Sequence, residues 1–496
     1  AILVSRLALL LFGRRDVFAR VACAGLPLVV LPFVAIVQVP TTWPRTLVVI
    51  ALVLGALLAI RAPLAPRAAW KLAAYVLIPA LIYAVSYAST AALSQWIDLF
   101  HRGESVGPAS DYLRGKVPYR DVFVLHGLLE DGLLDAWLMQ LFGRSIDVAI
   151  ARPVVLAALL PPLLWYLGIA VFESIPLALL CVAMGSWTTA ENNRTFLQVA
   201  SVTLFWIALR RRRRSVAVLA GIVAGIALFH SYEIGLYTIV GALAACALVA
   251  LIAMRVEWNG LSAAAAATFF IVGIAIGTAP FVVFLASRGA LGEFAKTSFV
   301  TIPRIIDAVW SLPFPDLVST FRNDLNLHTL ADFVLWEKFH LVLSPLTIAV
   351  AAVYCIQRWL RRRSDMLDHA LAVLTVFALI AQRTAFGRAE FRHQYFAAFL
   401  IGPMLVMLAL LATRGLRGLW RDAASVERRP PSAAGTDGTR AFVAMLVVCA
   451  VPIVAVLFWI PDLVNARIND LARYRLACCA SIAIRTRGRW SGGSRT

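Results

Sequence analysis

The chain has 496 residues, of which 61% are hydrophobic and 15% charged, and its formal net charge is +19. Soluble domains are about 45–50% apolar and about 25% charged, so this composition excludes an ordinary soluble domain. Apolar runs long enough to span a bilayer recur without period-two alternation, which predicts membrane helices rather than a β-barrel. The basic excess fits cytoplasmic loops and anionic lipid headgroups, and no soluble basic segment offers a nucleic-acid partner.

The hydrophobic runs predict an all-α polytopic membrane protein with about thirteen spans. The second and fifth spans are the shortest. The N-terminal order, apolar Leu7–Phe12 before Arg14 and Arg15, is the reverse of a cleavable signal. The predicted spans are 21–39, 46–60, 72–93, 149–171, 174–190, 195–209, 215–230, 233–254, 262–286, 340–357, 366–382, 394–412 and 441–460.

Arginines decide the predicted orientation. Placing Arg210 to Arg214 and the cluster from Arg358 to Arg363 inside also puts the other short basic loops inside. A single membrane domain at 1–460 then has outer loops at 94–145 and 287–339 and a cytoplasmic linker at 413–440. The basic tail at 461–496 would lie outside, against the charge rule. The clusters that mix acids with histidine, asparagine or arginine, at 96–143, 191–194, 230–233 and 383–393, all fall on the outer face.

The stretch from Trp96 to Gly143 is the acid-rich outer loop. Two short interfacial helices are predicted in it: one opened by Pro108 and closed by Gly115, and one from about Gly127 to Phe142. Between them, V-P-Y-R-D reads as an extended turn. The second outer loop contains several prolines, which predict a loop with only short helices.

Three acids of the first loop are candidates for a catalytic base: Asp98, Glu104 and Asp121. A carboxylate at the boundary of water and lipid is partly desolvated, which makes it a better proton acceptor. Asp98 is nearest the membrane in sequence and ranks first. Glu104 ranks second, because a helix N-terminus favours its ionised form. Asp121 ranks third, and an ordinary solvated loop acid is the alternative for each.

Arginines and histidines on the outer face are candidates for binding a phosphate. His126 suits a phosphate or a sugar hydroxyl, with a structural role as the alternative. Arginine forks bind phosphate bidentately, and contact with anionic lipid is their alternative. The spacing of acids and histidines leaves Mg²⁺ or Mn²⁺ open as a cofactor but matches no defined metal motif. The predicted donor-phosphate residues are His126, Arg194, Arg383, Arg388, Glu390, Arg392 and His393.

These motifs resemble the GT-C-fold membrane glycosyltransferases, in the branch of the bacterial protein mannosyltransferases and lipid A sugar transferases. The resemblance rests on D-x-x-H-R-G-E from Asp98, L-R-G-K-V-P-Y-R-D from Leu113, H-G at His126, and F-G-R-A-E-x-x-H from Phe386. It implies a polyprenyl-phosphate sugar donor and a cell-envelope lipid, glycan or protein acceptor. It also implies a loop acid as base and an active site on the extracytoplasmic face of the bacterial inner (plasma) membrane.

Two other functions remain open on sequence alone. A polymerase or ligase of lipid-linked glycans would use similar loops and arginines with no essential acid. A lipid or glycan transporter would carry ionisable residues at mid-membrane depth and internal repeat symmetry. Almost no acids lie within the predicted spans and no repeat is visible, so a glycosyltransferase is the first hypothesis.

Overall fold

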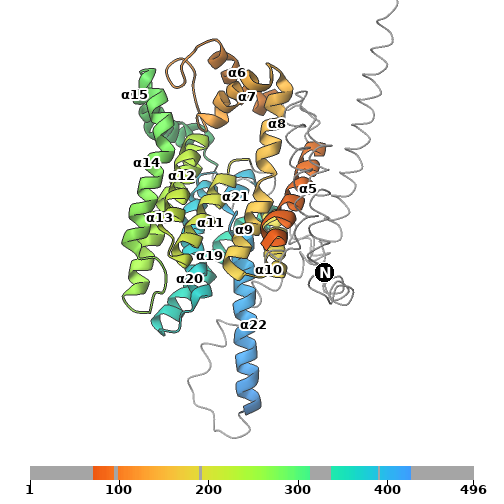
Figure 1. Ribbon diagram of the computed structural model, residues 1–496, viewed down its shortest axis with the longest axis vertical. Coiled ribbons are helices and arrows are strands. Elements are labelled where there is room, and N and C mark those ends of the chain that lie inside the picture. Colours follow the sequence, from red (N-terminus) through yellow and green to blue (C-terminus); the bar gives the residue numbers. More distant parts are fainter. Residues whose placement is uncertain (1–70, 94–98, 189–192, 313–336, 389–390, 426–496) are drawn as a thin grey trace, which may run out of the picture. The chain divides into compact units, whose positions relative to one another are not determined.

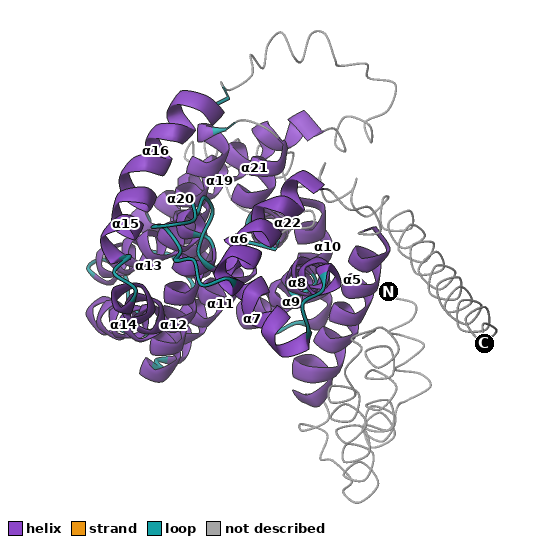
Figure 2. Cartoon of the chain, turned by 90° about the horizontal axis from the view of Figure 1, so that it is seen from above, coloured by secondary structure: helices purple, strands orange, loops and turns teal. Residues whose placement is uncertain are grey.

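The computed structural model describes residues 71–93, 99–188, 193–312, 337–388 and 391–425. Within these ranges every regular element is a helix, and β-pairing is confined to the isolated bridges Pro118–Val122 and Leu312–Arg388 (Figure 2). The predicted spans 21–39, 46–60 and 441–460 and the tail 461–496 lie outside the described residues.

Five of the described helices are long and apolar enough to cross a membrane, which agrees with a helical membrane protein. They are Ile146–Phe172, Tyr232–Ala253, Ala263–Ser287, Leu341–Leu360 and Met366–Gly387. Shorter apolar helices occupy Ala74–Tyr87, Ile175–Ser186, Arg214–His230 and Ile401–Gly415. The helices therefore begin and end close to where the apolar runs of the sequence do.

The chain divides into two compact units. The described part of the first unit contains the π-helix η1 (Ala73–Leu77), α5 (Ile78–Leu93), the second half of α7 (Leu134–Phe142) and α8 (Ile146–Ala157). Here α5 packs against α8, whose first turn is capped by the Ser145 hydroxyl accepting from the Asp147 N–H at 3.1 Å. Helix α9 (Leu160–Phe172) continues from α8 into the second unit.

The second unit is a bundle of antiparallel helices (Figure 1). Its members are α10 (Ile175–Thr188), α11 (Phe196–Arg211), α12 (Arg214–His230), α13 (Tyr232–Ala253), α14 (Ala263–Ser287), α19 (Glu337–Leu360), α20 (Met366–Gly387), α21 (Phe391–Ala397) and α22 (Ile401–Ser425). Helix α6 (Leu99–Leu113) lies across one end of these helices. Large buried rings fill its centre, where Phe205 meets Phe270 and Phe377 edge to face at 5.4 and 5.9 Å between ring centroids.

Helices α12 and α14 pack backbone against backbone. A Cβ atom at Gly221 would collide with the Phe270 carbonyl oxygen, and one at Gly273 would collide with that of Val218. Small residues permit this close approach where apolar lipid gives no hydrophobic drive for helix association. The contact fixes α12, and with it the position of His230 at its C-terminal end.

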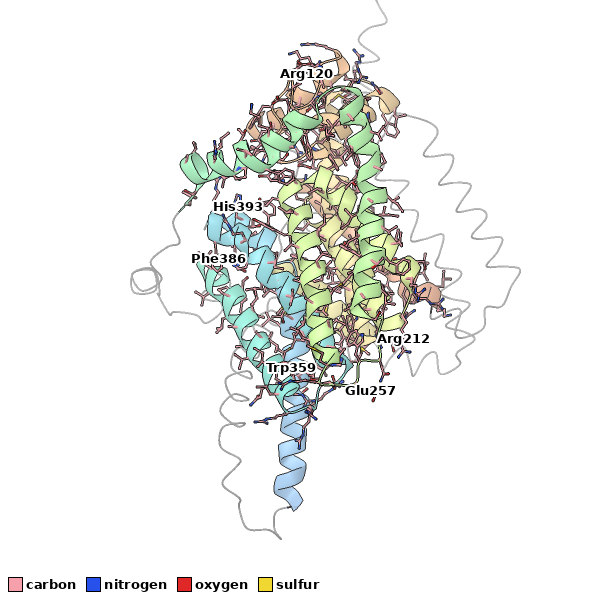
Figure 3. The ribbon with its side chains drawn as sticks, turned by 90° about the vertical axis from the view of Figure 1, so that its left-hand side faces the viewer. Arg120, Arg212, Glu257, Trp359, Phe386 and His393 are labelled. Atoms are coloured by element: carbon pink, nitrogen blue, oxygen red, sulfur yellow. The ribbon has the colours of Figure 1, made fainter. Side chains whose placement is uncertain are left out.

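The two ends of this bundle differ in chemistry. At one end, Arg212 donates to the Asn259 carbonyl at 2.8 Å and the Arg255 guanidinium covers the Trp359 ring at 4.8 Å. Figure 3 shows Arg212, Glu257 and Trp359 toward this end, and Phe386, His393 and Arg120 away from it. We call the end with Arg212 and Arg255 the basic end. The opposite end, where Glu130 and Asp131 are buried, is called the acidic end. Four of the helices that run between the two ends, α13, α14, α19 and α20, are long and apolar enough to cross a membrane.

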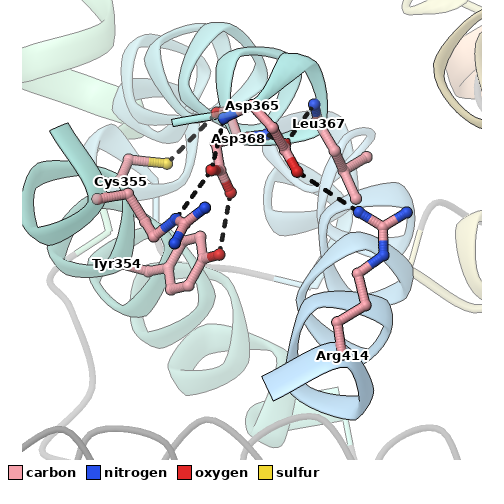
Figure 4. Close-up of polar contacts among 7 residues, drawn as sticks. Tyr354, Cys355, Asp365, Leu367, Asp368 and Arg414 are labelled. Atoms are coloured by element: carbon pink, nitrogen blue, oxygen red, sulfur yellow. Dashed lines mark hydrogen bonds and ion pairs between the residues drawn. The ribbon is translucent and has the colours of Figure 1, made fainter. Parts of the chain in front are cut away.

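A carboxylate network ties three helices together at the basic end (Figure 4). The buried Asp368 accepts from the Tyr354 hydroxyl at 2.9 Å and from Arg358 Nε at 2.9 Å, both on α19. Asp365 caps α20 and lies 3.6 Å from Arg414 of α22. This ion pair marks where α22 leaves the junction, and its last eleven residues, after Arg414, continue beyond it.

Four local predictions differ from the structure. Helix α6 begins at Leu99 and contains Pro108 rather than starting there, although it does end just before Gly115. The start of the second outer loop is helical from Leu291 to Trp310, as α15 (Leu291–Lys296), η3 (Thr297–Thr301), α16 (Ile302–Ile305) and η4 (Ile306–Trp310). Pro303 is tolerated because it lies in the first turn of α16.

The other two differences concern the C-terminal helices. The predicted span 394–412 is divided between α21 and α22, with a break over 398–400. Pro403 lies in the first turn of α22, directly after the break, where its missing N–H removes no intrahelical hydrogen bond. Helix α22 continues through 413–425, the first part of the predicted linker, because no proline follows until Pro430.

Candidate functional site

Asp131 is the centre of a buried polar cluster at the acidic end of the second unit. Its side chain is 5% exposed. One carboxylate oxygen accepts the backbone N–H groups of Leu125 and His126 at 2.5 and 2.8 Å. The other lies 3.0 Å from His126 Nδ1. A buried carboxylate requires such donors, so Asp131 organises the loop that precedes it.

A kink in the helix that follows brings Asp131 into this position. The π-helix η2 (Leu129–Leu133) has non-helical torsions at Asp131 (φ −86°, ψ 47°) and Gly132 (φ 99°, ψ −13°). Only glycine adopts this left-handed conformation without strain. A Cβ atom at Gly132 would also collide with the backbone of α6 at Ser105 and Ala109. The kink therefore seats the Asp131 loop against α6.

The same loop is fixed to the junction of α12 and α13. The Tyr232 N–H donates to the His126 carbonyl at 2.9 Å. Gly127 lies so close to the His230 carbonyl that a Cβ atom there would collide with it. Residues more than one hundred positions apart are thus brought together by backbone contacts.

Glu130, the neighbour of Asp131, links two other segments. Its carboxylate accepts from Asn193 Nδ2 at 2.8 Å, and its second oxygen lies 3.6 Å from His230 Nε2. His230 Nε2 in turn lies 3.0 Å from the Asn193 carbonyl oxygen. Two carboxylate–imidazole pairs, Asp131 with His126 and Glu130 with His230, therefore stand side by side.

Phenols and apolar side chains surround the Asp131 pair. Burial, and secondarily the charge of Asp131, raise the pKa values of Tyr112 and Tyr119 well above that of a free phenol. Both therefore remain neutral hydrogen-bond donors at physiological pH. The Tyr119 ring packs edge to face on Phe294, within a buried apolar cluster that includes Phe229 and Leu285. This apolar wall keeps water from the Asp131 carboxylate.

The three predicted base candidates have different settings. Asp98 lies outside the described residues. Glu104 is half-buried on α6, and the hydrogen bonds and ion pairs found among the described residues do not include it. Asp121 is exposed, pairs with Arg120 at 3.1 Å and accepts the Val117 N–H at 2.8 Å. The Arg120 guanidinium and that N–H lower the pKa of Asp121 below its usual value, which makes it a weaker proton acceptor.

The predicted phosphate-binding residues fall at the same end of the second unit. Arg194 stacks on the Phe396 ring at 5.6 Å, and His393 meets the same ring edge to face at 5.6 Å. Arg194 follows Asn193, so this group adjoins the Glu130 pair. Arg383 is exposed in the last turns of α20, and Arg388 follows that helix. Glu390 and the side chain of Arg392 lie outside the described residues.

A further bond joins α20 to α13. The Thr384 hydroxyl donates to Glu233 at 3.2 Å, at the first turn of α13. This bond places Arg383, next to Thr384 on α20, close to the start of α13. The predicted phosphate-binding residues and the buried Glu130 therefore lie at the same end of α13 and α20. Among the residues that the structure describes, no group of three or more His, Cys, Asp and Glu side chains is arranged to hold a metal ion.

The residues predicted for the site do not include Glu130, Asp131, Asn193, His230 or Glu233. The sequence does contain a signal for this pair, because His126-Gly127 is followed by Glu130-Asp131-Gly132. Two glycines this close together indicate a turn, and a turn can bring Asp131 back to His126. In comparisons with protein-family models, curated proteins and solved structures, no match to this chain was found.

Proposed function

We propose that the protein is a polytopic membrane glycosyltransferase of the GT-C type, with about thirteen spans. It moves a sugar from a polyprenyl-phosphate donor to a cell-envelope lipid, glycan or protein acceptor, with inversion at the anomeric carbon. The reaction takes place on the extracytoplasmic face of a bacterial plasma membrane. The loop acids Asp98, Glu104 and Asp121 are the base candidates that the family resemblance supplies.

One observation carries the proposal: two buried carboxylate–imidazole pairs lie at the end of the bundle opposite the arginine-rich end. Arginine-rich loops favour the cytoplasmic side, so the acidic end faces outward. Removing an acid such as Asp131 from water is costly unless donors hold it in place. Buried titratable groups held in this way are typical of catalytic sites, although structural networks also contain them.

The arginines support a phosphate leaving group. Arg383 and Arg388 bracket the end of α20, and Arg194 stands at the start of α11. A polyprenyl phosphate keeps its phosphate at headgroup depth, which is where the ends of spanning helices lie. Planar guanidinium groups bind phosphate through paired hydrogen bonds and stabilise the charge that develops as it leaves.

The placement of charge favours an enzyme over a transporter. Transporters keep ionisable side chains near the membrane midplane. In the four candidate spans of the second unit, the acidic and basic side chains are confined to the terminal turns, as Glu233, Arg358, Asp368 and Arg383 illustrate. A reaction at the membrane surface needs its charges at the helix ends.

The test is transfer by purified protein in proteoliposomes. Prenyl-phosphate hexoses and pentoses are supplied with an extract of cell-envelope lipids, and released prenyl phosphate is measured. We expect release that depends on both donor and acceptor. A variant at the basic end, Arg212→Ala, serves as the matched control and should transfer at the wild-type rate. Folded protein that releases no prenyl phosphate from any donor would overturn the proposal.

A further inference from the structure

We infer that His126, held by Asp131, is the proton acceptor of the transfer reaction. The inference rests on the proposed function and names a residue for a role that the family resemblance gives to a loop acid. Two observations support it: the hydrogen bonds that the Asp131 carboxylate accepts, and the greater solvent exposure of the His126 side chain.

The Asp131 carboxylate fixes the orientation of the imidazole. One of its oxygens is occupied by the N–H groups of Leu125 and His126, which locks the carboxylate to the loop backbone. The other oxygen lies 3.0 Å from His126 Nδ1. An ionised carboxylate only accepts hydrogen bonds, so Nδ1 carries the hydrogen. In the neutral imidazole the lone pair is then on Nε2.

Exposure separates the two members of the pair. The His126 side chain is 21% exposed, whereas that of Asp131 is 5% exposed. Asp131 is also engaged by three donors, which makes it the less available member as well as the less exposed one. His126 is the accessible member, and Asp131 is its positioning residue. Carboxylates orient imidazole bases in the same way in hydrolytic triads.

The neighbouring pair provides an internal contrast. The His230 side chain is 2% exposed, and its Nε2 lies 3.0 Å from the Asn193 carbonyl oxygen. A carbonyl accepts only, so this nitrogen donates and has no lone pair to offer. Glu130 and His230 therefore hold the scaffold together, and His126 alone of the two histidines has the geometry of a base.

The proposed step balances in atoms and electrons. The acceptor O–H bond breaks as its proton moves to His126 Nε2, and the hydroxyl oxygen bonds to the anomeric carbon. The bond from that carbon to the phosphate oxygen breaks, and its electron pair leaves with the prenyl phosphate. The imidazolium then returns its proton to water. A positioned base of this kind contributes about 10²–10⁴-fold to the rate.

The first experiment separates catalysis from structure by substitution. Asparagine at 126 keeps an N–H where Nδ1 stands, so it preserves the bond to Asp131 but has no Nε2. We expect His126→Asn to melt like wild type and to transfer about 10²–10⁴-fold more slowly. We also expect added imidazole to restore part of the rate in His126→Ala. His101→Asn, an exposed position on α6, is the matched control.

Each outcome of that experiment decides one point. Wild-type transfer by His126→Asn, with an active wild-type enzyme, would overturn the role of His126 and leave the glycosyltransferase standing. A wild-type protein inactive toward every donor would remove the proposed function, and the role of His126 in it.

The second experiment does not depend on transfer. In protein labelled with ¹⁵N-histidine, the signals of His126 are assigned from their loss in His126→Asn. In the neutral ring we expect hydrogen on Nδ1 and the lone pair on Nε2. Hydrogen on Nε2 in the neutral ring would contradict the inference whatever the enzyme transfers.

Discussion

Glu130 and Asp131 are consecutive in the chain, yet each carboxylate contacts a different histidine. Asp131 lies 3.0 Å from His126 Nδ1, and Glu130 lies 3.6 Å from His230 Nε2. On a regular helix two neighbouring side chains point about 100° apart. This divergence lets Asp131 hold the loop that carries His126 while Glu130 contacts the junction of α12 and α13.

Asp131→Ala should destabilise the folded protein strongly. It would leave the N–H groups of Leu125 and His126 buried without an acceptor, at about 1–3 kcal/mol for each unsatisfied group. Thermal unfolding in detergent, followed by tryptophan fluorescence, measures the effect. Asp121→Ala removes an exposed carboxylate from the same loop and should cost far less. Equal losses in the two variants would contradict the central place of Asp131.

Glu130 and Asn193 should be energetically coupled. Their side chains share a 2.8 Å hydrogen bond across 63 residues of sequence. A double-mutant cycle with Glu130→Gln and Asn193→Ala should give an interaction free energy of about 0.5–3 kcal/mol. The same cycle between Glu130 and Asp365, at opposite ends of the second unit, is the control. Additive effects of Glu130 and Asn193 would show that the bond contributes nothing to stability.

Gly221→Ala should destabilise the α12–α14 pair. The added methyl group meets the Phe270 carbonyl, and overpacking of this kind costs about 1–3 kcal/mol. Gly107→Ala is the matched control, because it lies within α6 and a Cβ atom there meets open space. That control should be neutral or stabilise the helix, by up to about 1 kcal/mol. The two melting temperatures should therefore move in different directions or by clearly different amounts.

Asp121 should make its contribution to stability only above acidic pH. Arg120 and the Val117 N–H hold the pKa of its carboxyl below the usual value. A group with a depressed folded-state pKa stabilises the protein above its unfolded pKa, about 3.9, and loses that effect as the pH falls through the folded value. The difference in melting temperature between wild type and Asp121→Asn should be constant from pH 7 to 5 and shrink below about pH 4. A difference that persists unchanged to pH 3 would argue against the ion pair.

The two ends of the second unit should be accessible from opposite sides of the membrane. Cysteines at the exposed Lys116 and Arg288 should react with an impermeant thiol reagent added outside intact cells, in a background without native cysteine. Cysteines at the exposed Arg213 and Arg363 should react only after the membrane is opened. Labelling of the second pair and not the first would reverse the proposed orientation.

The sequence predicted the helices better than it predicted the site. The span predicted at 233–254 corresponds to Tyr232–Ala253, because a long apolar run bounded by polar residues has one stable conformation in a bilayer. The site depends on partners far apart in sequence. Asp131 falls within the interfacial helix predicted from about Gly127 to Phe142, but its contacts depend on the kink at Gly132 and on the loop that carries His126.

Local patterns also misplaced some boundaries, for identifiable reasons. Pro108 was taken as a helix start, yet α6 accommodates it in its interior. Asn193 and His230 lie beside Glu130 only because α11 and α12 are antiparallel neighbours, and helix pairing cannot be deduced from the composition of either helix. The roles predicted for Asp98, Glu104 and Asp121 remain predictions for the variants to decide.

The contact of α12 with α14 limits how this protein can change shape. Two helices that touch through their backbones at Gly221 and Gly273 cannot slide or roll past one another without first separating. His230, at the end of α12, and the loop that contacts it are therefore held in a fixed position relative to α14. Movement at the acidic end is therefore expected from side chains and connecting loops, and not from sliding of α12 along α14.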